Sequence, residues 1–316
     1  MSKASTAKFI PYDLRPAKQA ERRILMDFLK CANEAGMSVA DCRYVGMGGT
    51  MFYDFHLMHR FLGIKQMISL ERDPKMHPRS EFNCPFDFIS VQNQTVADFL
   101  TFDADDCATI YWLDYDDGLG ADIIADIASL GTRVKRGGFA FATVYAEPPG
   151  ALEKQSAEQR LQWFQDQLGE FAIGLTTADM ATAAFPKTVH RVLTAAFRNA
   201  FAPRTDGQFQ LLFQVEYKDS SPMVTVGGCF SREEDSARIL HRVKADLPFM
   251  LASTPYRIKH LNLTERERAL FDLAVTKKRK NSQQANLLRS LGFKKRDFEA
   301  YKDLIRFLPR YHESII

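Results

Sequence analysis

The sequence predicts an α/β protein, with a Rossmann-like, doubly wound, mostly parallel sheet that ends in an antiparallel hairpin, and a small C-terminal helical domain. Short β-branched and aromatic runs alternate with amphipathic stretches over residues 16–145, which is typical of parallel strands joined by right-handed crossovers. Two further strand-like runs are separated only by residues 218–222, a connection that favours a hairpin. Beyond residue 255 the pattern is helical.

Composition agrees with one large and one small globular domain. The chain has 316 residues, 46% hydrophobic and 26% charged. We expect a domain over residues 1–254, with residues 1–41 as an N-terminal helical cap, and a small basic domain over residues 255–316. Neither a signal-like apolar run nor a stretch of ~20 apolar residues is present, so we expect a cytoplasmic protein without membrane contact. Five scattered cysteines indicate reduced packing residues and no metal site.

The first elements are a helix, a strand, a glycine turn and a second helix. Apolar residues recur at helical spacing over Pro16–Ala35, with Pro16 suited to the first turn. Residues Arg43–Met47 form a buried strand pattern that runs into the turn Gly46–Gly49, and helical spacing returns over Thr50–Leu62.

The remaining elements follow in order. Strands are predicted at Gln66–Leu70, Phe86–Val91, Ala108–Leu113 and Gly138–Tyr145, with a helix at Leu119–Leu130 and helical segments between residues 151 and 201. The hairpin strands are Phe209–Tyr217 and Met223–Phe230. A capping box at Thr264–Glu267 opens the C-terminal helices, which continue at Ser282–Leu291 and Lys295–Leu308 with Gly292 between them.

The glycine turn and Glu71 together indicate a cofactor site. In open α/β sheets a ligand binds beyond the carboxyl ends of the strands, where glycines let the backbone approach it. Glu71 follows the second strand at the distance expected of a ribose-binding acid. A dinucleotide fingerprint would have a third glycine at Met51, so the turn fits a cofactor without a pyrophosphate better. A purely structural turn is the alternative.

An acidic patch, Leu113–Gly118, ends the fourth strand on the same edge as the glycine turn. A carboxylate at this edge can orient a nucleophile or remove its proton, and we select Asp114 and Asp116 for this role. The alternative is an Asp-rich turn in which Asp116 or Asp117 caps the next helix.

Six segments of the chain carry a resemblance to a known family. They are Tyr12–Lys18, Tyr44–Gly48, Asp54–Phe55, Ile68–Arg72, Phe82–Asn83 and Trp112–Asp116. Together they resemble the bacterial family described as putative O-methyltransferases. The resemblance implies a class I methyltransferase fold with S-adenosylmethionine as cofactor and an unknown methyl acceptor.

The expected site residues fall into three groups. The cofactor residues are Gly46, Met47, Gly48, Gly49, Glu71, Arg72, Asn93 and Asp114. The catalytic residues are Asp114 and Asp116, and the substrate residues are Arg15, Lys18 and Tyr115. Arg15, Lys18 and Arg22 share one helix face and could offer cations to an acidic substrate, although a solvated face is the alternative, above all for Arg22. We assign no role to His56 or His59.

Eight cations with no acid among them gather over residues 277–296. They are Lys277, Lys278, Arg279, Lys280, Arg289, Lys294, Lys295 and Arg296. With the helix-turn-helix pattern around Gly292, they suggest that Lys277–Arg296 docks a nucleic acid or another polyanion. A solvated charged face is the alternative.

Three functions remain open at this point: a methyltransferase, a nicotinamide-dependent (NAD) oxidoreductase, and a non-catalytic nucleic-acid-binding module. Met51 in place of glycine counts against the second, and the presence of both Glu71 and Asp114 counts against the third. We therefore expect a methyltransferase, with oxygen as the methylated atom.

Overall fold

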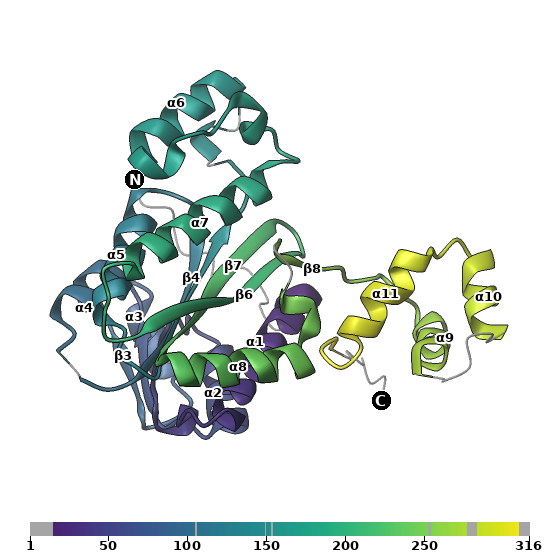
Figure 1. Cartoon of the computed structure of the whole chain (residues 1–316), viewed down its shortest axis with the longest axis horizontal. Coiled ribbons are helices and arrows are strands. Elements are labelled where there is room, and N and C mark those ends of the chain that lie inside the picture. Colours follow the sequence, from purple (N-terminus) through teal and green to yellow (C-terminus); the bar gives the residue numbers. More distant parts are fainter. Residues whose placement is uncertain are drawn as a thin grey trace.

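The computed structural model describes residues 15–104, 106–148, 150–152, 154–251, 254–276 and 283–309. Within these residues an eight-stranded sheet has the order β3-β2-β1-β4-β5-β7-β6-β8. Helices cover both faces of the sheet, and α9, α10 and α11 stand apart from it at the right of Figure 1. The predicted α/β class is confirmed.

Five parallel strands form one half of the sheet. They are β1 (Arg43–Gly46), β2 (Gln66–Leu70), β3 (Ile89–Gln92), β4 (Thr109–Gly118) and β5 (Gly138–Tyr145). The chain runs outward from β1 to β3 and returns to the other side of β1 as β4. This reversal places a topological switch point between β1 and β4, where such folds bind ligands.

The other half contains the antiparallel hairpin that the short connection predicts. β6 (Gln208–Lys218) and β7 (Pro222–Ser231) form a hairpin, and β7 lies antiparallel to β5. A short strand, β8 (Tyr256–Ile258), then runs parallel to β6. The sheet therefore reaches a few residues past the expected boundary at residue 254, because a three-residue strand leaves no periodic signal in the sequence.

The helices form two layers and a C-terminal group. They are α1 (Pro16–Glu34), α2 (Tyr53–Leu62), α3 (His77–Phe82), α4 (Val96–Phe102), α5 (Ala121–Arg133), α6 (Ala157–Leu168), α7 (Phe185–Phe201), α8 (Glu233–Asp246), α9 (Glu265–Thr276), α10 (Gln283–Ser290) and α11 (Lys295–Leu304). One apolar core joins α1, α2 and α8 to the sheet, and a second joins α4, α5, α6 and α7 to its other face.

Helix α1, the main helix of the predicted N-terminal cap, packs against the sheet. Phe28 meets the rings of Phe139, Phe141 and Phe213 edge-on, with ring centres 5.9–6.3 Å apart. Even the charged residues of its first turns are buried, and Arg22 is only 3% exposed. The solvated-face interpretation of Arg22 is therefore wrong, because β6, α2 and α8 surround this helix.

Three element boundaries differ from the prediction for local reasons. β4 continues to Gly118, so the acidic patch lies mostly in a strand, and Gly120 is the N-cap residue of α5 in place of Asp116 or Asp117. α2 begins only at Tyr53, because Phe52 adopts the left-handed conformation (φ 47°) at the end of the glycine turn. β3 begins at Ile89, since Phe86 packs at a tilted angle on the His59 ring outside the sheet.

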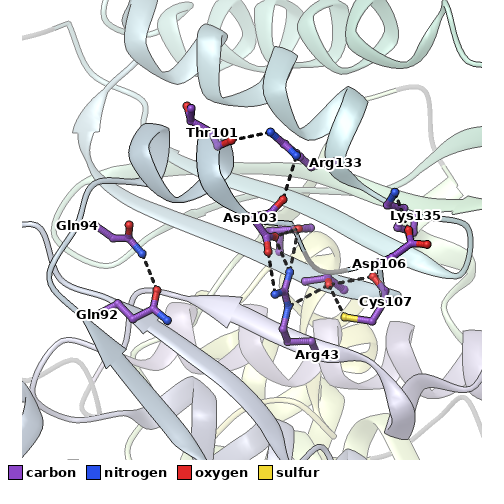
Figure 2. A network of polar contacts seen from close by, with 11 residues as sticks. Arg43, Gln92, Gln94, Thr101, Asp103, Asp106, Cys107, Arg133 and Lys135 are labelled. Carbon is purple, nitrogen blue, oxygen red and sulfur yellow. Dashed lines mark hydrogen bonds and ion pairs between the residues drawn. The ribbon is translucent and has the colours of Figure 1, made fainter.

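A buried polar network closes the amino-terminal edge of the sheet (Figure 2). Arg43 of β1 donates to both carboxylate oxygens of Asp103, over 2.9 and 2.5 Å, and Tyr111 of β4 donates to the same carboxylate over 2.8 Å. Arg133 of α5 donates to the main-chain oxygens of Asp103 and Thr101. The network fixes the end of α4 against β1, β4 and α5.

The C-terminal helices contain the predicted capping box and turn. Thr264 and Glu267 exchange hydrogen bonds at the start of α9, and Gly292 (φ 96°) separates α10 from α11. Phe307, just beyond α11, packs on Phe249, and Arg23 of α1 donates to the Phe307 carbonyl. Four cations of the basic cluster, Lys277, Lys278, Arg279 and Lys280, lie outside the described residues.

Candidate active site

A cavity of about 400 Å³ lies at the carboxyl ends of β1, β2 and β4, at the switch point of the sheet. The turn from Met47 to Met51 forms one wall and the end of β2 forms another. Residues 94–97 at the start of α4, the end of β4 and the first turns of α5 complete it. Its size is within the range of small-molecule sites.

The glycine turn requires glycine at two positions. The Gly48 N–H donates to the Ser69 hydroxyl over 3.1 Å, and a Cβ on Gly48 would lie 2.8 Å from both the Phe52 ring and that hydroxyl. Gly49 has φ 54°, which side chains disfavour. Met47, Gly48 and Gly49 line the cavity, whereas Gly46 lies behind it, where a Cβ would collide with the Tyr44 hydroxyl.

Glu71 enters the cavity at the end of β2. Its main chain is held on both sides, since its N–H donates to the Gln92 carbonyl over 3.0 Å and its own carbonyl accepts from Asn93 Nδ2 over 2.7 Å. One carboxylate oxygen accepts the Asp73 N–H over 2.9 Å. Burial raises the pKa of Glu71, which is 7% exposed. Asn93 does not line the cavity; it positions the residue that does.

Residues at the ends of β2 and β4, together with Asp126 of α5, complete the mouth of the cavity. Arg72 beside Glu71 forms an ion pair of 2.9 Å with Asp117, which joins the ends of β2 and β4. Asp116 lines the cavity and is exposed. The Tyr115 hydroxyl donates to Asp126 of α5 over 2.7 Å, and burial raises the pKa of Asp126 to about 6.

Asp114 lies at the inner end of this acidic edge with 20% of its side chain exposed. Burial raises the pKa of Asp114, and the ammonium of Lys18, 2.8 Å away, opposes the rise. Burial would lower the pKa of Lys18, but Asp114 and Glu21 raise it well above its usual range. Lys18 is thus a buried partner of the site, not an exposed cation for a substrate.

The other two predicted cations have different surroundings. Arg22 lines the cavity but pairs with Asp54 over 2.5 Å and lies 4.8 Å from the ring centre of Tyr53. Arg15 precedes α1 and does not line the cavity. Lys18 and Arg22 are therefore paired with carboxylates, and the geometry gives no support to an acidic substrate.

Carboxylates dominate the charge of the cavity. Among the described residues that line it there are seven acids and two guanidinium groups. The acids are Asp54, Glu71, Asp114, Asp116, Asp117, Asp122 and Asp126. Sequence reasoning assigned no role to Asp54, Asp122 or Asp126, although the last two are four residues apart and so share one face of α5.

Comparison with known proteins gives a family over nearly the whole chain. The model of the family described as "Putative O-methyltransferase" matches residues 10–316. Comparison with curated proteins gives no significant match.

Solved structures show weak similarity. The N-methyltransferase NodS from Bradyrhizobium japonicum has a TM-score of 0.41 and 12% identity, over 73% of this chain and 94% of that one. The fibrillarin pre-rRNA processing protein of Methanococcus jannaschii has a TM-score of 0.39 and 10% identity, over 64% of this chain and 74% of that one. An O-methyltransferase family protein from Burkholderia thailandensis has a TM-score of 0.37 and 12% identity, over 67% of this chain and 57% of that one. These similarities are too distant to bear on the acceptor.

Proposed function

Because the chain belongs to the family described as "Putative O-methyltransferase", we propose that it binds S-adenosylmethionine in the cavity beside the glycine turn and methylates a hydroxyl acceptor. The observation that carries this proposal is the excess of carboxylates around a turn built for close backbone approach. When bound, S-adenosylmethionine supplies a methyl group on a positively charged sulfur, and an acidic cavity attracts that charge.

The residues present fit this cofactor. The backbone of Met47–Thr50 provides a wall without protruding side chains at Gly48 and Gly49, and the Glu71 carboxylate can accept hydrogen bonds from two ribose hydroxyls. A dinucleotide fits less well, since its pyrophosphate would face the carboxylates of Asp116, Asp117 and Asp122. The cavity therefore favours a methyltransferase over a nicotinamide-dependent oxidoreductase.

Asp114 is the residue we propose to act on the acceptor. It is the innermost acid of the β4 edge and retains contact with the cavity, so its carboxylate can orient a hydroxyl group and accept its proton. Asp116 lies nearer the solvent and has room to contact the acceptor.

We also propose that the protein is cytoplasmic. All five of its cysteines are free, and a reducing compartment favours free cysteines.

A ligand-induced change in melting temperature tests the proposal. S-adenosylmethionine or S-adenosylhomocysteine at a hundred times its dissociation constant should stabilise the protein by about 2.7 kcal/mol, and NAD should not. The Gly48→Val variant is the control, because the added side chain would fill the space beside Phe52 and Ser69. Stabilisation by NAD alone would contradict the proposal.

A further inference from the structure

Behind the inner end of the cavity, one ammonium group lies between two carboxylates. Lys18 Nζ is 2.8 Å from Asp114 Oδ2 and 2.8 Å from Glu21 Oε2. Lys18 and Glu21 are 2% and 0% exposed, whereas Asp114 opens to the cavity. The ammonium thus connects the cavity carboxylate to a second carboxylate that solvent does not reach.

Glu21 is anchored from the centre of the sheet. The Thr225 hydroxyl of β7 donates to its other carboxylate oxygen, and Thr225 and Thr143 share a hydrogen bond of 2.9 Å. Trp112 Nε1 in turn donates to the Thr143 hydroxyl over 3.0 Å. Side chains on three adjacent strands therefore fix Glu21 on the far side of Lys18 from the cavity.

The hairpin fixes Lys18 itself. Asp219, in the turn between β6 and β7, accepts the main-chain N–H groups of Ala17 and Lys18 over 2.9 and 3.0 Å. These are donors that the first turn of a helix leaves without a partner. Because Asp219 belongs to the sheet hairpin, the contact sets the position of α1 along the sheet, and with it the reach of Lys18.

The charges around Asp114 do not balance. On its packed side it faces ionisable groups from four elements, namely Lys18, Glu21 and Arg22 of α1, Tyr44 of β1, Asp54 of α2 and Tyr217 of β6. With Asp114 included, the group holds three carboxylates and two cations. The charge of Asp114 therefore depends on how the Lys18 ammonium is shared with Glu21.

We propose that Lys18 and Glu21 are positioning residues that set the charge of Asp114, with Lys18 keeping the cavity carboxylate ionised and Glu21 competing for the same ammonium. This inference rests on the proposed function, in which Asp114 acts on the acceptor. It predicts opposite effects for two adjacent substitutions. Loss of the ammonium makes Asp114 bind a proton at higher pH, and loss of the competing charge makes it do so at lower pH.

The test compares two ligands that differ in the charge on sulfur. S-adenosylmethionine is a sulfonium and S-adenosylhomocysteine is a neutral thioether, so the ratio of their affinities reports the charge facing the sulfur. Calorimetry from pH 5 to pH 9 should show this ratio rising in favour of S-adenosylmethionine as Asp114 loses its proton. The midpoint of this change in affinity ratio with pH should rise in Lys18→Met and fall in Glu21→Gln, by about one pH unit or more in each case.

Two further variants separate positioning from folding. Lys18→Arg, which keeps the positive charge, should return the midpoint toward that of the parent protein. Lys30→Met is the matched control, because Lys30 lies on the same helix, pairs with Asp27 and is 41% exposed; its midpoint should not move. Melting temperatures establish that each variant is folded. If Lys18→Met does not fold, the near-isosteric Glu21→Gln carries the test alone.

The outcomes distinguish this inference from the proposed function. If neither ligand binds the parent protein, both fail. If both ligands bind and the midpoint stays fixed in folded Glu21→Gln and Lys18→Met, or moves the same way in both, the function stands and the inference is wrong.

Discussion

At the scale of single residues, Glu71 is the most direct probe of the cofactor site. Glu71→Ala should weaken S-adenosylmethionine binding roughly tenfold to a hundredfold, because hydrogen bonds to a charged group contribute ~1.5–3 kcal/mol. The fold should persist, since Gln92 and Asn93 hold the main chain of this residue rather than its carboxylate. Calorimetry measures the affinity, with Glu81→Ala on α3 as an exposed control. Equal affinities in the two variants would remove Glu71 from the site.

Asp126 links the site to the pH dependence of stability. Its pKa is about 6 in the folded chain and ~3.9 in an unfolded chain, so its contribution is fully present below about pH 4 and is lost as the pH rises through 6. Asp126→Asn removes this loss and keeps an acceptor for the Tyr115 hydroxyl. The difference in the free energy of unfolding between this variant and the parent protein should be about 2–3 kcal/mol more favourable to the variant at pH 8 than at pH 4.

Denaturant unfolding at the two pH values measures this difference. Asp166→Asn, on an exposed face of α6, is the control and should show no such gain. A gain in Asp126→Asn that is the same at pH 4 and pH 8 would mean that ionisation of Asp126 is not its cause.

Site residues that directly follow a strand can be predicted from the sequence more readily than residues that another part of the chain brings to the site. Glu71 and Asp114 stand directly after or at the end of a buried apolar run, and parallel strands bring such positions to one edge. The burial of Lys18 and Arg22 depends on carboxylates far along the chain, on β4 and α2. A helical face of cations looks solvated in sequence until those partners are known.

At the scale of elements, the network around Arg43 holds α4 against the sheet. Arg43→Met would leave the Asp103 carboxylate buried without its cation, so the free energy of unfolding should fall by about 3–5 kcal/mol. Lys135→Met, at an ion pair exposed on both sides, should cost far less, because solvent screens the two charges. Both pairs are visible in Figure 2. Urea unfolding measures the two effects, and equal losses would contradict the burial argument.

Long periodic elements were predicted well, and short or mixed ones were not. α1, β5 and the hairpin strands agree with the pattern to within a residue, because each has a long run of apolar residues at regular spacing. β2 agrees as well, although it has only five residues. α3 and α4 have six and seven residues, too few for two turns of periodic signal. α8 was missed because its first turn carries Glu233, Glu234 and Asp235 ahead of a sparse apolar face.

At the scale of the whole molecule, the cavity and the C-terminal helices differ in charge. The cavity is acidic, whereas the exposed residues Arg289, Lys294, Lys295 and Arg296 surround the turn between α10 and α11. Figure 1 shows that these helices stand away from the sheet. No helix in the described ranges is long and apolar enough to cross a membrane. A polyanion docked at the basic end would therefore contact the protein away from the carboxylates of the cavity.

The basic segment Lys277–Arg296 provides a last prediction. If six of its cations meet DNA phosphates, log affinity should fall against log salt with a slope of about −5, at ~0.9 per contact. Changing Lys277, Lys278, Arg279 and Lys280 to glutamine should bring the slope to about −2. Anisotropy titrations over a range of salt concentrations measure it.

The control changes four exposed cations of the main domain, Arg60, Lys65, Lys75 and Arg79, to glutamine, which alters the net charge equally. It should leave the slope near −5, because a local contact depends on where the charges lie and not on their sum. α11 also carries acids, and Lys295 lies 3.5 Å from one of them, Glu299, so the slope depends heavily on the four changed residues. Absence of binding at low salt, or equal slopes in the two variants, would mean that the cluster is a solvated face.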